Sequence, residues 1–106
     1  MEAALKAIGA PTRRTILRLV AEGERTAGEI AAHFAVTRPA ISQHLTVLKE
    51  AGLVDERRNG TQRLYRVRPQ GLEEIRTFLD ELWDVRLAAL KREAEREEKR
   101  RNANDT

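Results

Sequence analysis

Side chains that can hydrogen-bond to bases gather in the segment TRPAISQHLTVLKEAGLV, which spans residues 37–54. Ile41, Leu45 and Leu48 recur there at spacings of four and three residues, and this periodicity predicts a helix that buries them on one face. The opposite face starts with small, uncharged, hydrogen-bonding residues, whereas a solvated helix in so charged a chain would carry mostly Lys, Arg and Glu. Such a face suits contacts with base edges in a DNA major groove.

The candidate DNA contacts of this helix lie mainly in its first two turns. They are Arg38, Ala40, Ser42, Gln43, His44, Thr46 and Lys49. Hydroxyl and amide groups can bond to base edges, Ala40 and the Thr46 methyl group can touch thymine methyl groups, and Lys49 is placed for the phosphate backbone. Two interpretations of His44 stay open: a DNA contact, or a half-buried polar residue that bonds to a neighbouring helix. Glu50, further along, would be repelled by phosphate.

The helices around this segment can be bounded from capping residues and helix breakers. Thr26 and Glu29 form a capping-box pattern, Pro11 suits a first helical turn, and Thr37 caps the segment described above. The four expected helices span residues 3–8, 11–22, 27–34 and 38 to about 51. The third and fourth are joined by a connection too short to be a mobile loop, and together they predict a helix-turn-helix.

A β-hairpin is predicted in LVDERRNGTQRLYRV, because Asn-Gly is the strongest short signal for a two-residue type I′ turn. With Asn59-Gly60 as the turn, the expected pairs are Arg58 with Thr61, Glu56 with Arg63, and Val54 with Tyr65. That register leaves Arg57 and Arg58 without a neutralising partner. The candidate DNA contacts of the hairpin are Arg57, Arg58, Asn59, Gly60, Thr61 and Arg63, which suit phosphates or the minor groove.

A long helix is expected from Leu72 to about Arg100, after the breakers Pro69 and Gly71. Its apolar stripe is too wide for one small domain to cover, so part of it should meet a partner helix. The stripe residues assigned to that contact are Leu79, Leu82, Trp83, Leu87 and Leu90. The end of the chain is nearly all charge and should fray. We therefore expect one domain over residues 1–92 and a charged tail over 93–106.

Composition narrows the function classes further. The 106 residues contain no cysteine, which removes disulfides and thiolate metal sites. The sequence also shows no signal peptide or membrane span, so a cytoplasmic protein is expected.

The charge is distributed unevenly along the chain. Residues 1–68 hold twelve Lys or Arg against seven Asp or Glu, while residues 69–106 hold eight Lys or Arg against ten Asp or Glu. A basic body favours double-stranded DNA as a partner. With two histidines, no paired carboxylates and no glycine-rich phosphate loop, an enzyme is not expected.

Four motifs in order carry a resemblance to a known family: PTRRTILRLV, TAGEIAAHF, TRPAISQHLTVLKEAGLV and RRNGTQRLYRV. Together they resemble the ArsR/SmtB family of bacterial transcriptional repressors, nearest to the branch of the SdpR autorepressor, over about residues 3–90. The resemblance implies a winged helix-turn-helix of order α-α-α-α-β-β-α that dimerises through its terminal helices and represses transcription at a dyad-symmetric operator. It assigns base reading to Ser42, Gln43 and His44, the wing tip to Arg58, Asn59 and Gly60, and adds Leu5 and Ile8 to the dimer interface.

Family members that sense metals often carry thiolates near the third helix or histidines on the last one. Here Thr26, Gly28 and Ala31 stand where the thiolates would be, and no histidine follows His44. We therefore expect no metal site and no cofactor, and the effector stays unidentified. Two alternatives remain: a winged-helix module for protein–protein contact, and a repressor that senses a metal through carboxylates of the last helix, such as Asp80, Glu81 and Asp84.

Overall fold

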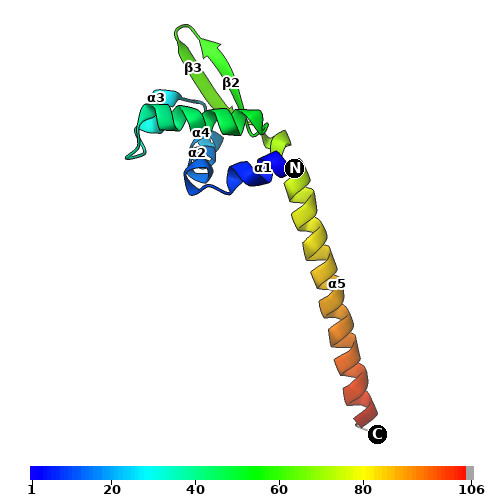
Figure 1. Ribbon diagram of the computed structural model, residues 1–106. Helices are drawn as coiled ribbons and strands as arrows, with labels where there is room; N and C mark the ends of the chain where they lie inside the picture. The colour runs from blue at the N-terminus through cyan, green and yellow to red at the C-terminus, as the bar shows by residue number, and fades with distance from the viewer. Residues whose placement is uncertain (105–106) are drawn as a thin grey trace. The chain divides into compact units, whose positions relative to one another are not determined.

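The computed structural model describes residues 1–104 and contains the expected helices and hairpin strands in their expected order, together with a short strand and a 3₁₀ helix that were not expected (Figure 1). The elements are α1 (Glu2–Ile8), α2 (Pro11–Glu22), β1 (Arg25–Thr26), α3 (Ala27–Ala31), α4 (Arg38–Glu50), β2 (Val54–Asn59), β3 (Gln62–Val67), the 3₁₀ helix η1 (Pro69–Leu72) and α5 (Glu73–Asn104). They divide into two compact units, one over Met1–Ile75 and one that begins at Arg76. The predicted class, mainly helical with a small hairpin, is confirmed.

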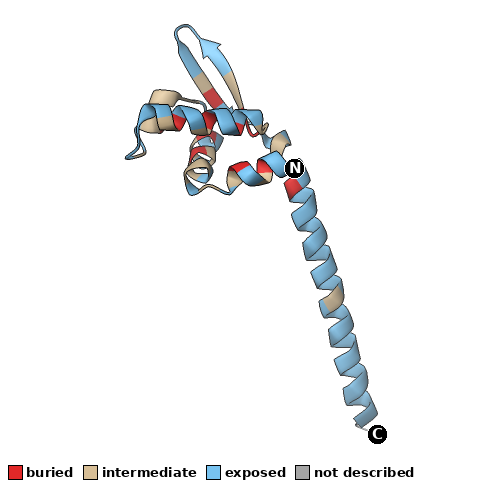
Figure 2. Ribbon diagram, in the orientation of Figure 1, coloured by how far each residue is buried: buried red, intermediate tan, exposed pale blue. Residues whose placement is uncertain are grey.

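The first unit has an almost purely aliphatic core, with the buried faces of its helices turned inward (Figure 2). Its buried residues are Ala4, Ala7, Ile16, Val20, Ile30, Ile41, Leu45, Leu48, Leu53, Val54, Tyr65 and Ile75. Ile41, Leu45 and Leu48 all lie on the inner face of α4, as their spacing predicts. That inner face fixes which residues α4 presents outward.

Capping residues set the ends of the central helices. The Thr26 side chain accepts a hydrogen bond from the Glu29 backbone amide at 3.1 Å, and the Glu29 side chain accepts one from the Thr26 amide at 3.3 Å, which confirms the capping box. Thr37 caps α4 through the Ala40 amide at 3.3 Å. Past α4, Gly52 takes a φ of +75°, a conformation that glycine adopts without strain.

The predicted end of the third helix is wrong: α3 stops at Ala31 instead of Phe34. The amides of His33 and Phe34 bond to the carbonyls three residues back, both at 3.1 Å, so the chain tightens into turns there. This early end leaves residues 32–37 to make the connection to α4. The helix-turn-helix is therefore built from a shorter first helix and a longer turn than the sequence suggests.

The predicted register of the hairpin is also wrong. Asn59 pairs with Gln62, Arg58 with Arg63 and Val54 with Val67, so Gly60 and Thr61 form the turn. Gly60 has a φ of +65°, and no other type of residue between 1 and 104 has a positive φ, which rules out the type I′ turn centred on Asn59. The partner of each β2 residue moves by two positions. Since side chains alternate with period two, the faces of both strands are preserved.

A third strand that the sequence did not indicate extends the sheet of the β2–β3 hairpin, which is the wing of the structure. β1 pairs antiparallel with β3, Arg25 opposite Tyr65 and Thr26 opposite Leu64, giving the sheet order β1-β3-β2. A two-residue strand is too short for any alternation of apolar and polar residues to reveal it. Its effect is to tie the base of the wing to the start of α3.

The second unit consists of the remainder of α5, and it leaves a stripe of large apolar side chains exposed. Leu79, Leu82, Trp83, Leu87 and Leu90 keep 50%, 51%, 65%, 57% and 42% of their surface accessible. The helix is continuous from Glu73 to Asn104, with ion pairs between Arg86 and Glu93 and between Arg100 and Glu97. Division of the chain at residue 93 stays a prediction. No helix within residues 1–104 is both long and apolar enough to cross a membrane.

Close backbone contact at the turn before α5 makes Gly71 a position where any side chain is costly. A Cβ added there would lie 2.0 Å from the Gly52 carbonyl oxygen and 2.8 Å from its carbon. We expect Gly71→Ala to lower the free energy of unfolding by about 3 kcal/mol, measured by urea denaturation. Gly23→Ala is the control, because its Cβ would meet nothing within 4 Å. Equal stability of the two variants would contradict the prediction.

Candidate nucleic-acid interface

The outer face of α4 presents polar side chains, as the sequence predicts. Ser42, Gln43 and Thr46 are exposed and Ala40 is half-buried. The Thr46 hydroxyl donates to the Ser42 carbonyl at 3.0 Å, so its donor is used within the helix. Thr46 therefore offers only a methyl group and acceptor lone pairs to a ligand. Arg38, at the start of the helix, is exposed and makes no ion pair within residues 1–104.

His44 makes a contact with a neighbouring helix. Its Nδ1 atom lies 3.3 Å from Nη1 of Arg13 on α2, and the residue is half-buried. This is the second of the two interpretations of His44 left open by the sequence. The contact uses one ring nitrogen, so Nε2 is not engaged by Arg13, and a DNA contact through that atom stays a prediction.

The wing carries one fully unpaired arginine where the sequence suggested two. Nε of Arg57 lies 2.6 Å from a carboxylate oxygen of Glu24, in the turn before β1, so the expectation that Arg57 lacks a neutralising partner is wrong. Arg58 makes no ion pair within residues 1–104 and is exposed together with Asn59, Gly60 and Thr61. The tip of the wing therefore presents one free cation flanked by small polar groups.

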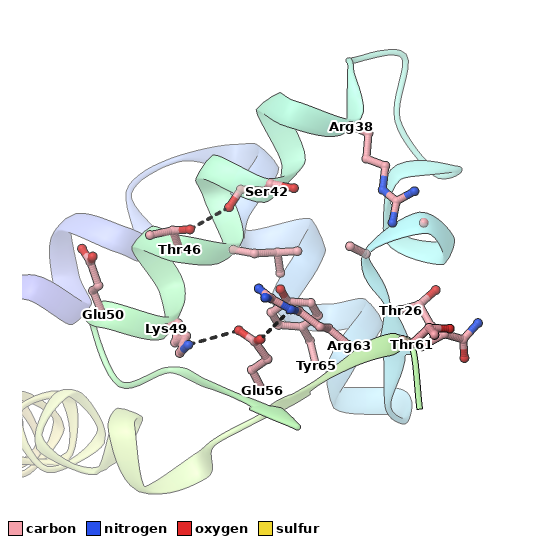
Figure 3. A pocket seen from close by; sticks show the side chains of 14 residues that line it. Thr26, Arg38, Ser42, Thr46, Lys49, Glu50, Glu56, Thr61, Arg63 and Tyr65 are labelled. Carbon is pink, nitrogen blue, oxygen red and sulfur yellow. Dashed lines mark hydrogen bonds and ion pairs between the residues drawn. The ribbon is translucent and has the colours of Figure 1, made fainter. Parts of the chain in front are cut away.

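A groove of about 760 Å³ lies between α4 and the wing, and six of the thirteen candidate DNA contacts line it (Figure 3). Arg38, Ser42, Thr46 and Lys49 line it from α4, and Thr61 and Arg63 line it from the wing. Between them, Glu56 accepts from Lys49 Nζ at 3.1 Å and pairs with Arg63 Nε at 3.4 Å. The predicted Glu56–Arg63 pair thus forms despite the shifted register, because the two residues remain diagonal neighbours on one face.

Tyr65 lies at the base of this groove, and its surroundings favour the neutral phenol. Burial is the main cause that raises the pKa of Tyr65 above 10.0, and the negative charge of Glu56 raises it further. Arg63 and Lys49 lower the same pKa, but they do not reverse the direction. The folded protein therefore holds the phenolic proton more tightly than the unfolded chain does.

We expect a spectroscopic titration of Tyr65 to show this shift directly, because Tyr65 is the single tyrosine of the chain. The phenolate absorbance should appear with a midpoint above pH 10.0 in folded protein. The contribution of the neutral Tyr65 phenol to the free energy of unfolding is fully present below the pKa that Tyr65 has in the unfolded chain. It is lost as the pH rises through the pKa that Tyr65 has in the folded protein. Glu56→Gln should move the midpoint down, because it removes a charge that disfavours the phenolate. A midpoint at or below that of the denatured protein would contradict the assignment.

The predicted dimer-interface residues fall on two elements. Leu5 and Ile8 lie on α1, where both are half-buried against the core of the first unit. Leu79, Leu82, Trp83, Leu87 and Leu90 lie on α5 and are exposed. Within residues 1–104, His, Asp and Glu side chains nowhere form a group of three or more that could hold a metal ion.

Two helices joined by a turn, followed by a hairpin that borders the outer face of the second helix, define a winged helix-turn-helix, a fold of DNA-binding regulators. Residues 10–56 match the family described as "Bacterial regulatory protein, arsR family". The chain belongs to the ArsR family.

Several relatives and solved structures are similar to the chain. The HTH-type transcriptional regulator Rv2034 of Mycobacterium tuberculosis is 48% identical over 80 residues, which cover 76% of this chain and 75% of that protein. The transcriptional repressor SdpR of Bacillus subtilis is 48% identical over 60 residues, covering 57% of this chain and 67% of SdpR. The homodimeric winged helix-turn-helix DNA-binding domain of Mb0332 from Mycobacterium bovis matches with a TM-score of 0.63 at 31% identity, over 78% of this chain and 77% of that one.

Proposed function

We propose that two copies of this chain bind a dyad-symmetric DNA operator and repress transcription from it. In each copy the first two turns of α4 enter the major groove, and Arg58 at the wing tip meets phosphate or the minor groove. The observation that supports the proposal is the groove lined by Arg38, Ser42, Thr46 and Lys49 of α4 and by Thr61 and Arg63 of the wing. SdpR, a similar protein, is a transcriptional repressor.

The second copy is the occupant proposed for the apolar stripe of α5. Five large side chains, each at least 42% exposed, form a surface that a matching helix would cover. The Mb0332 domain, to which this chain is similar, is homodimeric. We assign Leu5 and Ile8 of α1 to the same interface. Two α4 helices held by such a dimer would face successive major grooves of one operator.

Repression in this proposal needs no thiolate-bound metal, because the chain has no cysteine. Asp80, Glu81 and Asp84 are exposed on α5 and are simply solvated carboxylates here. Calorimetric titration with zinc and with nickel should give no binding heat and leave operator affinity unchanged. A site of micromolar affinity for either ion would overturn this part of the proposal.

The direct test is a gel-shift measurement with a dyad-symmetric fragment from the promoter of the protein's own gene. Binding should be specific against random competitor DNA and should weaken steeply as salt is raised, because contacts to phosphate release counterions. Equal affinity for the promoter fragment and for random DNA at every salt concentration would contradict sequence-specific repression. Absence of any DNA binding would favour a protein–protein module instead.

A further inference from the structure

Arg13 of α2 bonds to two other helices at once. Its Nε donates to the Ala7 carbonyl at 2.6 Å, and its Nη2 donates to the Lys6 carbonyl at 3.3 Å, both at the end of α1. Its Nη1 lies 3.3 Å from Nδ1 of His44 on α4. The guanidinium therefore spans from the end of α1 to the helix that the proposed function assigns to base reading.

The chemistry of this contact fixes where the His44 proton resides. A guanidinium group carries only donors, so the nitrogen that faces it must accept with a lone pair. Nδ1 of His44 is then unprotonated, and the neutral ring carries its proton on Nε2. His44 is half-buried on α4, and in this tautomer its Nε2–H, which Arg13 does not engage, is a hydrogen-bond donor.

The planarity of the guanidinium links the His44 ring to α1. With Nε and Nη2 both held by α1 carbonyls, the direction of the remaining Nη1 donor is set by the position of α1. A lysine at the same position has one ammonium group on a flexible stem and cannot hold three acceptors in one plane. The neighbouring Arg14 provides a comparison, because it donates to the Ile8 carbonyl at 2.8 Å and makes no hydrogen bond to His44 within the described residues.

We propose that Arg13 is a positioning residue that holds His44 in its Nε2–H tautomer and makes His44 a directed hydrogen-bond donor to DNA. The donor would meet an acceptor of the major groove, such as N7 or O6 of guanine or O4 of thymine, or else a phosphate oxygen. The DNA part of this inference rests on the proposed function. The tautomer and its dependence on Arg13 do not.

The first test is a measurement of the ring nitrogens of His44 by ¹⁵N NMR on the full-length protein without DNA. We expect the Nε2–H tautomer in the wild type, a mixture of tautomers in Arg13→Lys, and the wild-type signature in the control Arg14→Lys. Circular dichroism of each variant verifies folding. A proton on Nδ1 in the wild type overturns the proposal even if a variant fails to fold, as does an unchanged tautomer in folded Arg13→Lys.

The second test compares affinities for operator and random DNA. Arg13→Lys should lower their ratio about tenfold, Arg14→Lys should leave it nearly unchanged, and Arg13→Lys should have no further effect in a His44→Ala background. His44→Gln, whose amide can donate from a similar position, should retain more of the ratio than His44→Ala. A fall in both affinities that leaves their ratio unchanged identifies phosphate as the acceptor and overturns a contact between His44 and a base edge, whereas a fall in the ratio identifies a base edge.

The two tests fail in distinguishable ways. If the wild type shows the expected tautomer but no preference for any operator, the proposed function is wrong, and the donor role toward DNA falls with it. If the operator is bound specifically but Arg13→Lys and His44→Ala act independently, Arg13 does not act through His44. Operator recognition then stands while this inference is overturned.

Discussion

Replacing Leu79 and Leu82 together by Glu is expected to leave the protein monomeric and to lower operator affinity about a hundredfold or more. These side chains are 50% and 51% exposed on the single chain and belong to the apolar stripe assigned to the second copy. Four carboxylates in a dimer would have to be buried without partners, which costs far more than the lost apolar contacts contribute. Each monomer would then bind only one half-site of the operator. It would lose the added affinity that a dimer gains by binding both half-sites at once.

Analytical ultracentrifugation gives the oligomeric state, and Trp83 gives a second readout. Trp83 is the single tryptophan of the chain and is 65% exposed on the single chain, so dimerisation should shift its emission to shorter wavelength. The matched control is Thr77→Glu with Ala88→Glu, which adds the same charge to the opposite face of α5. A dimer that survives the Leu79 and Leu82 changes, or operator affinity that survives loss of the dimer, would contradict the assignment.

The second large effect is expected at the start of α4. Ser42→Ala with Gln43→Ala should reduce the ratio of operator to random-DNA affinity about a thousandfold or more, since each base contact contributes about 1–3 kcal/mol and a dimer makes each of the two contacts twice. Both side chains are exposed and neither is part of the core, so folding and dimerisation should be unaffected. Affinity for random DNA should hardly change, because phosphate contacts supply it.

Arg38→Ala is the matched comparison for that experiment. Arg38 is exposed and without an ion pair within the described chain, so its loss should weaken binding to all sequences alike. A plot of the logarithm of the DNA association constant against the logarithm of the salt concentration should also become less steep. Its slope should decrease in magnitude by about one for each copy in which Arg38 contacts phosphate. Fluorescence anisotropy with labelled operator and random duplexes at several salt concentrations separates the two patterns. Uniform weakening in the Ser42 and Gln43 variant would show that those residues do not read sequence.

Most of the helical architecture is predictable from the sequence because it is encoded locally. The spacing of Ile41, Leu45 and Leu48 predicts the buried face of α4, and the pair Thr26 and Glu29 predicts where α3 begins. The hairpin is predicted in the right place with the wrong register. Asn-Gly favours a type I′ turn, but here Gly60 alone takes positive φ and Asn59 remains in the strand. The local turn preference is therefore overridden by pairing along the strands.

The contacts that shape the candidate site could not be predicted in the same way. The Arg13–His44 contact joins residues 31 positions apart and the Arg57–Glu24 pair joins residues 33 positions apart. Neither spacing corresponds to a period of a helix or a strand, so only the packed fold shows them. The contacts of Glu56 could be predicted in part. Its pairing with Arg63 follows from the hairpin, whereas its bond to Lys49 depends on how the wing lies against α4.

Glu56 also has a consequence for how the proposed DNA-binding surface would discriminate among DNA sequences. Its carboxylate is a built-in counterion for Lys49 and Arg63, with its side chain 17% exposed between them. A phosphate that recruits either cation must compete with this carboxylate, so the net attraction to an arbitrary duplex is smaller than the number of cations suggests. Selectivity is a difference between two affinities. Because the attraction that every duplex shares cancels from that difference, one half-buried acid lowers the affinity for arbitrary DNA without lowering selectivity, and the contacts that distinguish one operator from another become a larger share of the binding free energy.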